Sequence, residues 1–161
     1  MINKYKNQKG ITLIEVLVVA IIIGIMLTLW SVSIAAKKAE VRDLKRLNDI
    51  NELKGAMELM KNETGSYDRA FCDLTYVSSC VKKENSELKV FLPGIGRIND
   101  PAELRKSCGE GDNCTSSECN YAFTHLDPDD YQVLFHLEKG DERYGGEGCY
   151  RLSPLGINKV K

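Results

Sequence analysis

Residues 9–30 read KGITLIEVLVVAIIIGIMLTLW, a short basic approach followed by a long apolar run. From Ile11 to Trp30 the run has about 20 residues, or roughly 30 Å of helix, which is enough to cross a bilayer. Three lysines lie in the ten residues before it. Because positive residues that precede an apolar span tend to remain in the cytoplasm, we expect a single-pass transmembrane helix at residues 11–30, with the rest of the chain on the outer side.

One carboxylate, Glu15, lies inside this apolar run. A charged side chain in a membrane-spanning helix costs a few kcal/mol at mid-bilayer and less near the interface. An ionisable residue in such a place is a functional hypothesis by default, so Glu15 is the first candidate functional residue of the chain.

The helical pattern continues beyond the apolar run, without proline from Ser31 to Lys61 and without glycine until Gly55. Apolar residues recur at steps of three and four, at Val41, Leu44, Leu47, Ile50, Leu53, Met57 and Met60. The charged residues between them are assigned to a solvated face, namely Lys37, Lys38, Glu40, Arg42, Asp43, Lys45, Arg46, Asp49, Glu52 and Lys54. With Gly65 as a left-handed terminator, the pattern predicts one helix of about 54 residues, roughly 80 Å long. Residues 31–65 form its amphipathic half.

Residues 66–161 predict a small antiparallel sheet after an irregular middle segment. Residues 120–126 and 131–138 alternate apolar and polar side chains, and the Asp-Pro-Asp-Asp sequence between them suits a type I turn. Residues 149–152 are a third candidate strand. In the second strand one face is shared by Tyr131, Val133, Phe135 and Leu137, which we expect to pack on the amphipathic helix. The predicted fold class is therefore α+β.

Six cysteines lie in the outward part of the chain, at Cys72, Cys80, Cys108, Cys114, Cys119 and Cys149. An even number in a small exported domain favours disulfides, although six cysteines allow 15 connectivities. The short loop favours Cys72 with Cys80. Cys119 and Cys149 would start strands at the same end of the sheet, which makes them a second candidate pair and leaves Cys108 with Cys114.

The start of the chain, its apolar helix and its amphipathic continuation resemble type IV prepilins and the pseudopilins of type II secretion. The resemblance implies a type IV pilin fold, in which the long helix packs on a small antiparallel sheet. It also implies that a prepilin peptidase removes residues 1–10 by cutting between Gly10 and Ile11 and then N-methylates Ile11. In the filaments of this family, the carboxylate at the position of Glu15 faces the terminal amine of a mature subunit.

The function implied is that of a non-enzymatic structural subunit of a type IV pilus-like filament. Its partners would be identical or related pilin subunits, prepilin peptidase, the inner-membrane assembly machinery and the membrane itself. The precursor would lie in the inner membrane and the assembled form in an extracellular pilus. A pseudopilin in a periplasmic pseudopilus is the first alternative, a membrane-tethered binding module that does not polymerise is the second, and a tethered hydrolase or metal enzyme is the weakest.

No other pattern indicates catalysis or a cofactor. His125 and His136 lie in predicted strands, where a structural role is favoured, and no Cys-x-x-Cys pair indicates zinc. Candidate calcium ligands in the C-terminal loops are Asp127, Asp129, Asp130, Asp141 and Glu142. No EF-hand spacing connects them, so solvated turn acids are favoured. A net charge of -1 without a basic tract argues against nucleic-acid binding.

Overall fold

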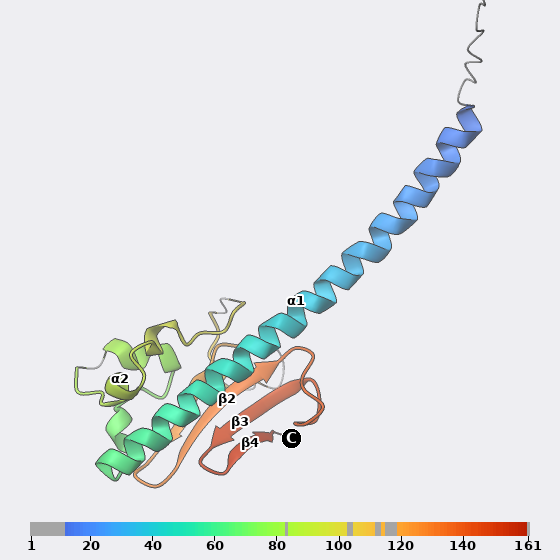
Figure 1. The fold of residues 1–161 in the computed structure, drawn as a ribbon. Helices are drawn as coiled ribbons and strands as arrows, with labels where there is room; N and C mark the ends of the chain where they lie inside the picture. The colour runs from blue at the N-terminus through green and yellow to red at the C-terminus, as the bar shows by residue number, and fades with distance from the viewer. Residues whose placement is uncertain (1–11, 83, 103–104, 112–113, 115–118, 161) are drawn as a thin grey trace, which may run out of the picture. The chain divides into compact units, whose positions relative to one another are not determined.

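The computed structural model describes residues 12–82, 84–102, 105–111, 114 and 119–160. The chain divides into two compact units, residues 1–38 and 39–161. The first contains the N-terminal part of helix α1, and the second contains the remainder of α1 and all the strands (Figure 1).

Helix α1 spans Leu13–Thr64, a length of 52 residues that confirms the long helix predicted from the sequence. At its start the amide of Glu15 donates to the carbonyl of Thr12 at 3.1 Å. Gly65 ends it in the left-handed region, with a φ of 81°, and its amide donates to the carbonyl of Lys61. The terminator predicted at Gly65 is therefore confirmed, and it is a position where a side chain would be strained.

The four strands form one antiparallel sheet in the order β1-β2-β3-β4. Their bounds are Ala122–Leu126 for β1, Tyr131–Leu137 for β2, Gly148–Ser153 for β3 and Gly156–Lys159 for β4. The first three correspond to the predicted strands. The sequence pattern does not predict β4, because Ile157 is the only apolar residue among its four positions and no alternation results.

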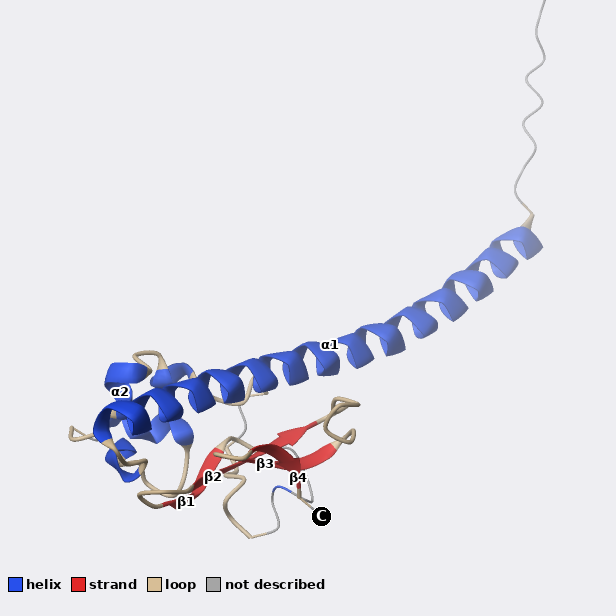
Figure 2. Cartoon of the chain, turned by 60° about the horizontal axis from the view of Figure 1, so that its bottom comes forward, coloured by secondary structure: helices blue, strands red, loops and turns tan. Residues whose placement is uncertain are grey.

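One face of the sheet packs against the part of α1 that belongs to the second unit (Figure 2). From β2 this core receives the side chains predicted to face the helix, Tyr131, Val133, Phe135 and Leu137, all of them fully buried. From α1 it receives Ile50, Leu53, Met57 and Met60. This packing confirms the α+β arrangement of a pilin fold.

Cysteines cover part of the other face of the sheet. A second buried cluster joins Ala122 of β1 and Cys149 of β3 to Cys108, Cys114 and Cys119. Where these cysteines lie, the sheet is buried on both faces, whereas Arg151 of β3 is exposed.

Short helices fill the chain between α1 and the sheet, where the sequence predicts irregular structure. Helix α2 spans Leu88–Phe91, and 3₁₀ helices span Asp68–Ala70, Val77–Lys82 and Ile95–Arg97. Each of them buries only one or two side chains. Elements this short carry too few apolar positions for a periodicity to be visible in the sequence.

Candidate functional site

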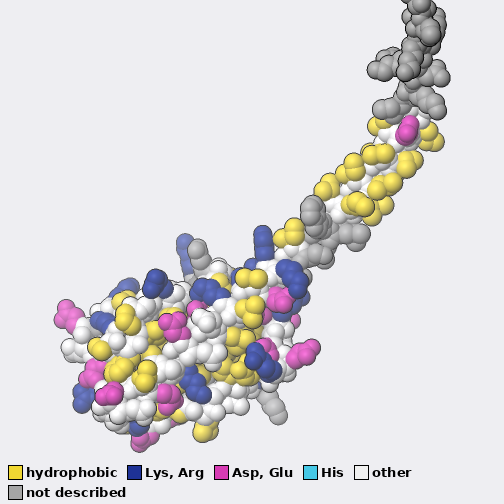
Figure 3. Space-filling view, in the orientation of Figure 1, with side chains coloured by type: hydrophobic (Ala, Val, Ile, Leu, Met, Phe, Trp, Pro, Cys, Tyr) yellow, Lys and Arg dark blue, Asp and Glu magenta, His cyan; other side chains and the backbone are white. Residues whose placement is uncertain are grey.

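The first candidate site is the N-terminal part of α1, which exposes its apolar side chains. The large apolar residues from Leu13 to Leu27 are each 48% to 83% exposed. Hydrophobic side chains gather along this part of the helix in Figure 3. An exposed apolar surface of this extent requires lipid or other protein around it.

Glu15 lies in the first turn of α1. It is the only charged residue between Thr12 and Ala36. Gly10 and Ile11, the expected processing positions, lie outside the described residues. Among the residues that the structure does describe, no helix has an apolar stretch long enough to qualify as a membrane span.

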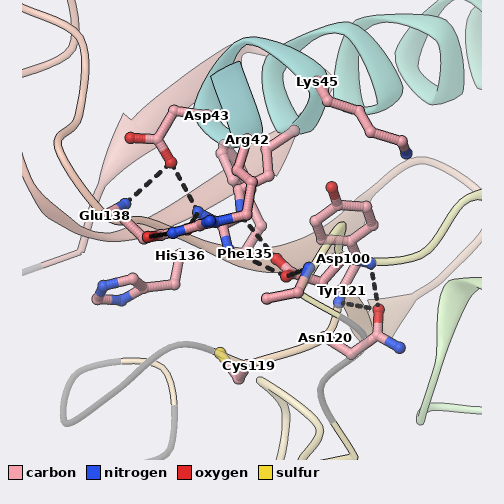
Figure 4. Close-up of polar contacts among 12 residues, drawn as sticks. Arg42, Asp43, Lys45, Asp100, Cys119, Asn120, Tyr121, Phe135, His136 and Glu138 are labelled. Carbon is pink, nitrogen blue, oxygen red and sulfur yellow. Dashed lines mark hydrogen bonds and ion pairs between the residues drawn. The ribbon is translucent and has the colours of Figure 1, made fainter. Parts of the chain in front are cut away.

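The second candidate site is an ion cluster at the start of the second unit, which sequence reasoning missed (Figure 4). Arg46 of α1 is fully buried. Its Nε donates to Asp100 at 2.6 Å, and its Nη1 donates to Asp43 at 2.7 Å and to Glu138 at 2.6 Å. Arg42 also pairs with Glu138, its Nε lying 2.6 Å from Oε1. Two guanidinium groups thus meet three carboxylates drawn from α1, a loop and the end of β2.

The Asp43 carboxylate also binds backbone. It accepts three successive amides, those of Glu138, Lys139 and Gly140, at 2.9, 2.7 and 3.0 Å. These amides follow the last residue of β2, so one side chain of α1 holds the exit of the central strand in place. Consecutive N–H groups that converge on an anion form a favourable electrostatic site for it.

The surroundings of Glu138 and Arg46 favour the ionised forms of both side chains. Hydrogen bonds from Arg42, and then from Arg46, outweigh burial and lower the pKa of Glu138 to about 2. Burial works against the charge of Arg46, but its hydrogen bonds with Asp100, Asp43 and Glu138 raise its pKa overall. At neutral pH Glu138 and Arg46 are therefore both ionised.

Burial of the cluster corrects the predicted face of α1. Asp43, Arg46 and Asp49 were expected on the solvated face and are buried. Val41 and Leu44 were expected on the apolar face and are 63% and 59% exposed. Among the buried positions, one series follows steps of four and three without interruption, namely Ala39, Asp43, Arg46, Ile50, Leu53, Met57 and Met60. This spacing marks the buried face of the helix in the sequence. Two residues of the series, Asp43 and Arg46, are charged, and for that reason they were assigned to the solvated face.

The disulfides are Cys72–Cys80, Cys108–Cys119 and Cys114–Cys149. The first is the expected pair, and the other two replace the expected Cys119–Cys149 and Cys108–Cys114. Cys119 precedes β1 and Cys149 lies on β3, so β2 separates them by two strand spacings, about 9–10 Å, which is beyond the reach of a disulfide.

Local backbone pairing explains the partners that form instead. The amide of Cys108 donates to the carbonyl of Asn120 at 2.9 Å, which places Cys108 beside Cys119. Cys114 lies over β2, where Nδ1 of His136 is 2.9 Å from the Cys114 carbonyl oxygen, and from there it reaches Cys149. Sulfurs of Cys108, Cys114 and Cys119 lie within 4.8 Å of one another, but each belongs to a disulfide, so they offer no thiolates to a metal.

The acids considered for calcium do not form one cluster. Asp127 lies 3.0 Å from His125, and Asp129 pairs with Lys61. These acids belong to the β1–β2 turn, whereas Asp141 lies in the β2–β3 loop, at the other end of β2. Hydrogen bonds from Arg143 lower the pKa of Asp141 to about 2. The structure thus brings none of the turn acids together with Asp141.

Comparison with known proteins gives one finding, at the start of the chain. Residues 5–31 match the prokaryotic N-terminal methylation motif. No curated protein and no solved structure matches the chain. The methylation motif, together with a long N-terminal helix followed by an antiparallel sheet, supports assignment of the chain to the family of type IV pilins and pseudopilins.

Proposed function

We propose that this chain is a structural, non-enzymatic subunit of a type IV pilus-like filament. The observation that carries the proposal is the N-terminal methylation motif on a helix whose apolar side chains, from Leu13 to Leu27, are all exposed. The precursor would be held in the inner membrane by this segment. After prepilin peptidase cuts between Gly10 and Ile11, the segment would become the contact between subunits.

Glu15 gives this assembly its register. Cleavage creates an α-amine at Ile11, four residues before Glu15 and roughly 6 Å away along a helix. An unpaired charge in apolar surroundings is costly, and an amine–carboxylate pair offsets the cost for both groups. In the membrane the Glu15 carboxylate would pair with its own amine, and in the filament with the amine of a neighbouring copy.

Charge pairing is needed because apolar burial alone does not favour the filament over the membrane. The exposed side chains of the N-terminal part of α1 are as well solvated by lipid tails as by other helices. The energies that differ between the membrane and the filament are those of side-chain packing and of the ion pair made by Glu15. Glu15 therefore has a larger expected role in assembly than in membrane insertion.

The direct test is the N-terminus of the mature protein, together with electron microscopy of material sheared from cells. We expect a chain that begins with N-methylated Ile11 and fibres that contain it. Glu15→Val should leave cleavage and membrane insertion intact and abolish fibres, whereas Glu15→Asp, which keeps the charge, should retain some. A mature protein that still begins with methionine and forms no fibres would refute the proposal in favour of a permanently tethered binding module.

Substitution of Gly10 tests the processing step separately. Gly10→Ala should be cleaved nearly normally and Gly10→Phe should not, because a bulky side chain would crowd the peptidase. Mass spectrometry of the membrane fraction distinguishes the two forms. Normal cleavage of the phenylalanine variant would contradict the proposed processing site.

A further inference from the structure

Two of the three disulfides lie next to each other in the second unit. The sulfurs of Cys108, Cys114 and Cys119 all lie within 4.8 Å of one another. Cys108 and Cys119 are bonded to each other, whereas Cys114 is bonded to Cys149, which the structure also describes and which is not a member of this group. One sulfur of the second bridge, that of Cys114, therefore lies beside both ends of the Cys108–Cys119 bond.

The surrounding backbone holds the three sulfurs in these positions. The amide of Cys108 donates to the carbonyl of Asn120, next to Cys119, at 2.9 Å. The sulfur of Cys114 lies 3.4 Å from the carbonyl oxygen of Phe135 on β2. All three cysteines are buried. If Cys114 lost its bond to a partner, its thiol would still have an acceptor at this place and would remain beside the Cys108–Cys119 bond.

A thiolate beside a disulfide is the arrangement from which disulfide exchange proceeds. The thiolate attacks one sulfur of the disulfide, forms a new bond with it and displaces the other sulfur as a thiolate. Attack of Cys114 on Cys108 would form a Cys108–Cys114 bond and return the electron pair to Cys119, which then takes a proton from water. Attack on Cys119 would instead release Cys108. The number of disulfides does not change, and the step is unimolecular because both reactants belong to one chain.

We propose that Cys108, Cys114 and Cys119 form a thiol–disulfide exchange site in which Cys114 is the nucleophile. The Cys114–Cys149 bridge keeps the site inactive. Reduction of that bridge by an external dithiol, which is itself oxidised to a disulfide, leaves thiols at Cys114 and Cys149 and activates the site. The inference goes beyond the proposed function and does not depend on filament formation, since all four cysteines belong to the second unit.

The exchange site gives the chain a way to correct its own pairing. Cys108 and Cys114 are six residues apart, and Cys114 and Cys119 are five apart. Every pairing among the three closes a short loop, and loop-closure entropy changes only slowly with length, so it selects none of them strongly. A bond from Cys114 to Cys149, 35 residues away, removes the nucleophile and leaves Cys108 with Cys119.

The first test compares two variants of the full-length chain in detergent, each of which leaves one cysteine thiol. Cys149→Ser frees Cys114, and Cys114→Ser is the matched control that frees Cys149. Free thiols are trapped with N-ethylmaleimide, and mass spectrometry of peptides identifies the bridges. Because only Cys114 lies beside both sulfurs of the Cys108–Cys119 bond, we expect its new bridges to be at least about tenfold more abundant than those of Cys149 in the control. An intact Cys108–Cys119 bond in every Cys149→Ser chain, or equal exchange in both variants, would overturn the inference.

A second measurement uses the unaltered chain and so does not depend on the folding of a variant. A limiting amount of a water-soluble phosphine reduces part of the disulfides at pH 5, where thiolates are scarce, and is then removed. After the pH is raised, we expect chains with a free Cys149 and with Cys114 bonded to Cys108 or Cys119. Their rate of formation should rise about tenfold per pH unit below the ordinary thiol pKa of about 8.5, because the thiolate is the attacking species. Absence of these chains, or a rate that does not change with pH, would refute the exchange site and leave the proposed function untouched.

Discussion

The two parts of α1 distribute charge in opposite ways. Between Leu13 and Leu27 the exposed surface is apolar and Glu15 is its only charge. From Ala39 onward the helix buries Asp43 and Arg46 and exposes Val41. The apolar side chains of the first part are exposed and need lipid or another protein around them. The buried ions of the second part are paired within the same chain. The comparison teaches that a charge in a helix has no fixed side, because its position depends on which partners the rest of the chain brings.

The largest expected effect comes from removing the cation at the centre of the buried cluster. Arg46→Met leaves Asp100 without its guanidinium partner and should lower the free energy of unfolding by about 3–5 kcal/mol. Urea denaturation of the full chain in detergent, followed by near-ultraviolet circular dichroism of the tyrosines, measures the loss. Arg151→Met, at an exposed position, is the control and should change it by less than about 0.5 kcal/mol. If the two substitutions lowered the free energy of unfolding equally, the buried ion cluster would not contribute to stability as we expect.

The disulfides should differ with the length of chain that they close. Cys114 and Cys149 are 35 residues apart, whereas Cys72 and Cys80 are 8 apart. Chain entropy predicts that replacing both members of a pair by alanine costs about 4 kcal/mol for the first pair and about 2.5 kcal/mol for the second. The same urea measurement gives the stability lost by each variant. A larger loss for the Cys72–Cys80 variant would indicate that chain entropy does not dominate.

Acid should weaken the second unit through Glu138. Its pKa is lowered to about 2 in the folded protein from an ordinary value of 4.5. A carboxyl group with a depressed pKa stabilises the fold fully above 4.5, and this contribution is lost as pH falls toward 2. After allowance for solvent screening we expect a loss of about 1–2 kcal/mol. Glu138→Gln should be less stable than the parent chain at pH 7 and should respond less to acid, and an unchanged acid response would argue against this role.

The smallest expected effect lies in the first unit. Ile22→Ala removes an exposed side chain and should change unfolding of the second unit by less than about 0.5 kcal/mol. The matched change Ile50→Ala, at a fully buried position of the same helix, should cost about 2–5 kcal/mol. A large effect of Ile22→Ala on the second unit would remove the distinction between the two parts of the helix.

The parts of the fold that depend on local pattern could be predicted from the sequence. The long helix, its terminator at Gly65 and the buried face of β2 each follow from the spacing of nearby residues. Strand β4 could not be predicted, because four residues with a single apolar side chain carry no period. Glu15 stands out in the sequence alone, since a carboxylate in an apolar run is rare.

The ion cluster and the disulfide pairing depend on contacts that no local pattern encodes. Asp100 is 54 residues from Arg46, and Glu138 is 92 residues from it. A sequence pattern does not show these distant partners, so it predicts that a charged residue on α1 faces solvent. The pairing of Cys114 with Cys149 likewise depends on the position of β2 between β1 and β3, which only the assembled sheet defines.

The capture of the β2 exit by Asp43 has a mechanical consequence. Traction applied to the start of α1 would reach the second unit at its first turns, where Asp43 and Arg46 lie. From there the load is shared at once by the loop at Asp100 and by three amides at the end of β2, while the Cys114–Cys149 disulfide holds the neighbouring strand β3. Bonds loaded in parallel must rupture together, so a fibre built from this subunit would resist pulling better than if the same bonds were loaded one after another.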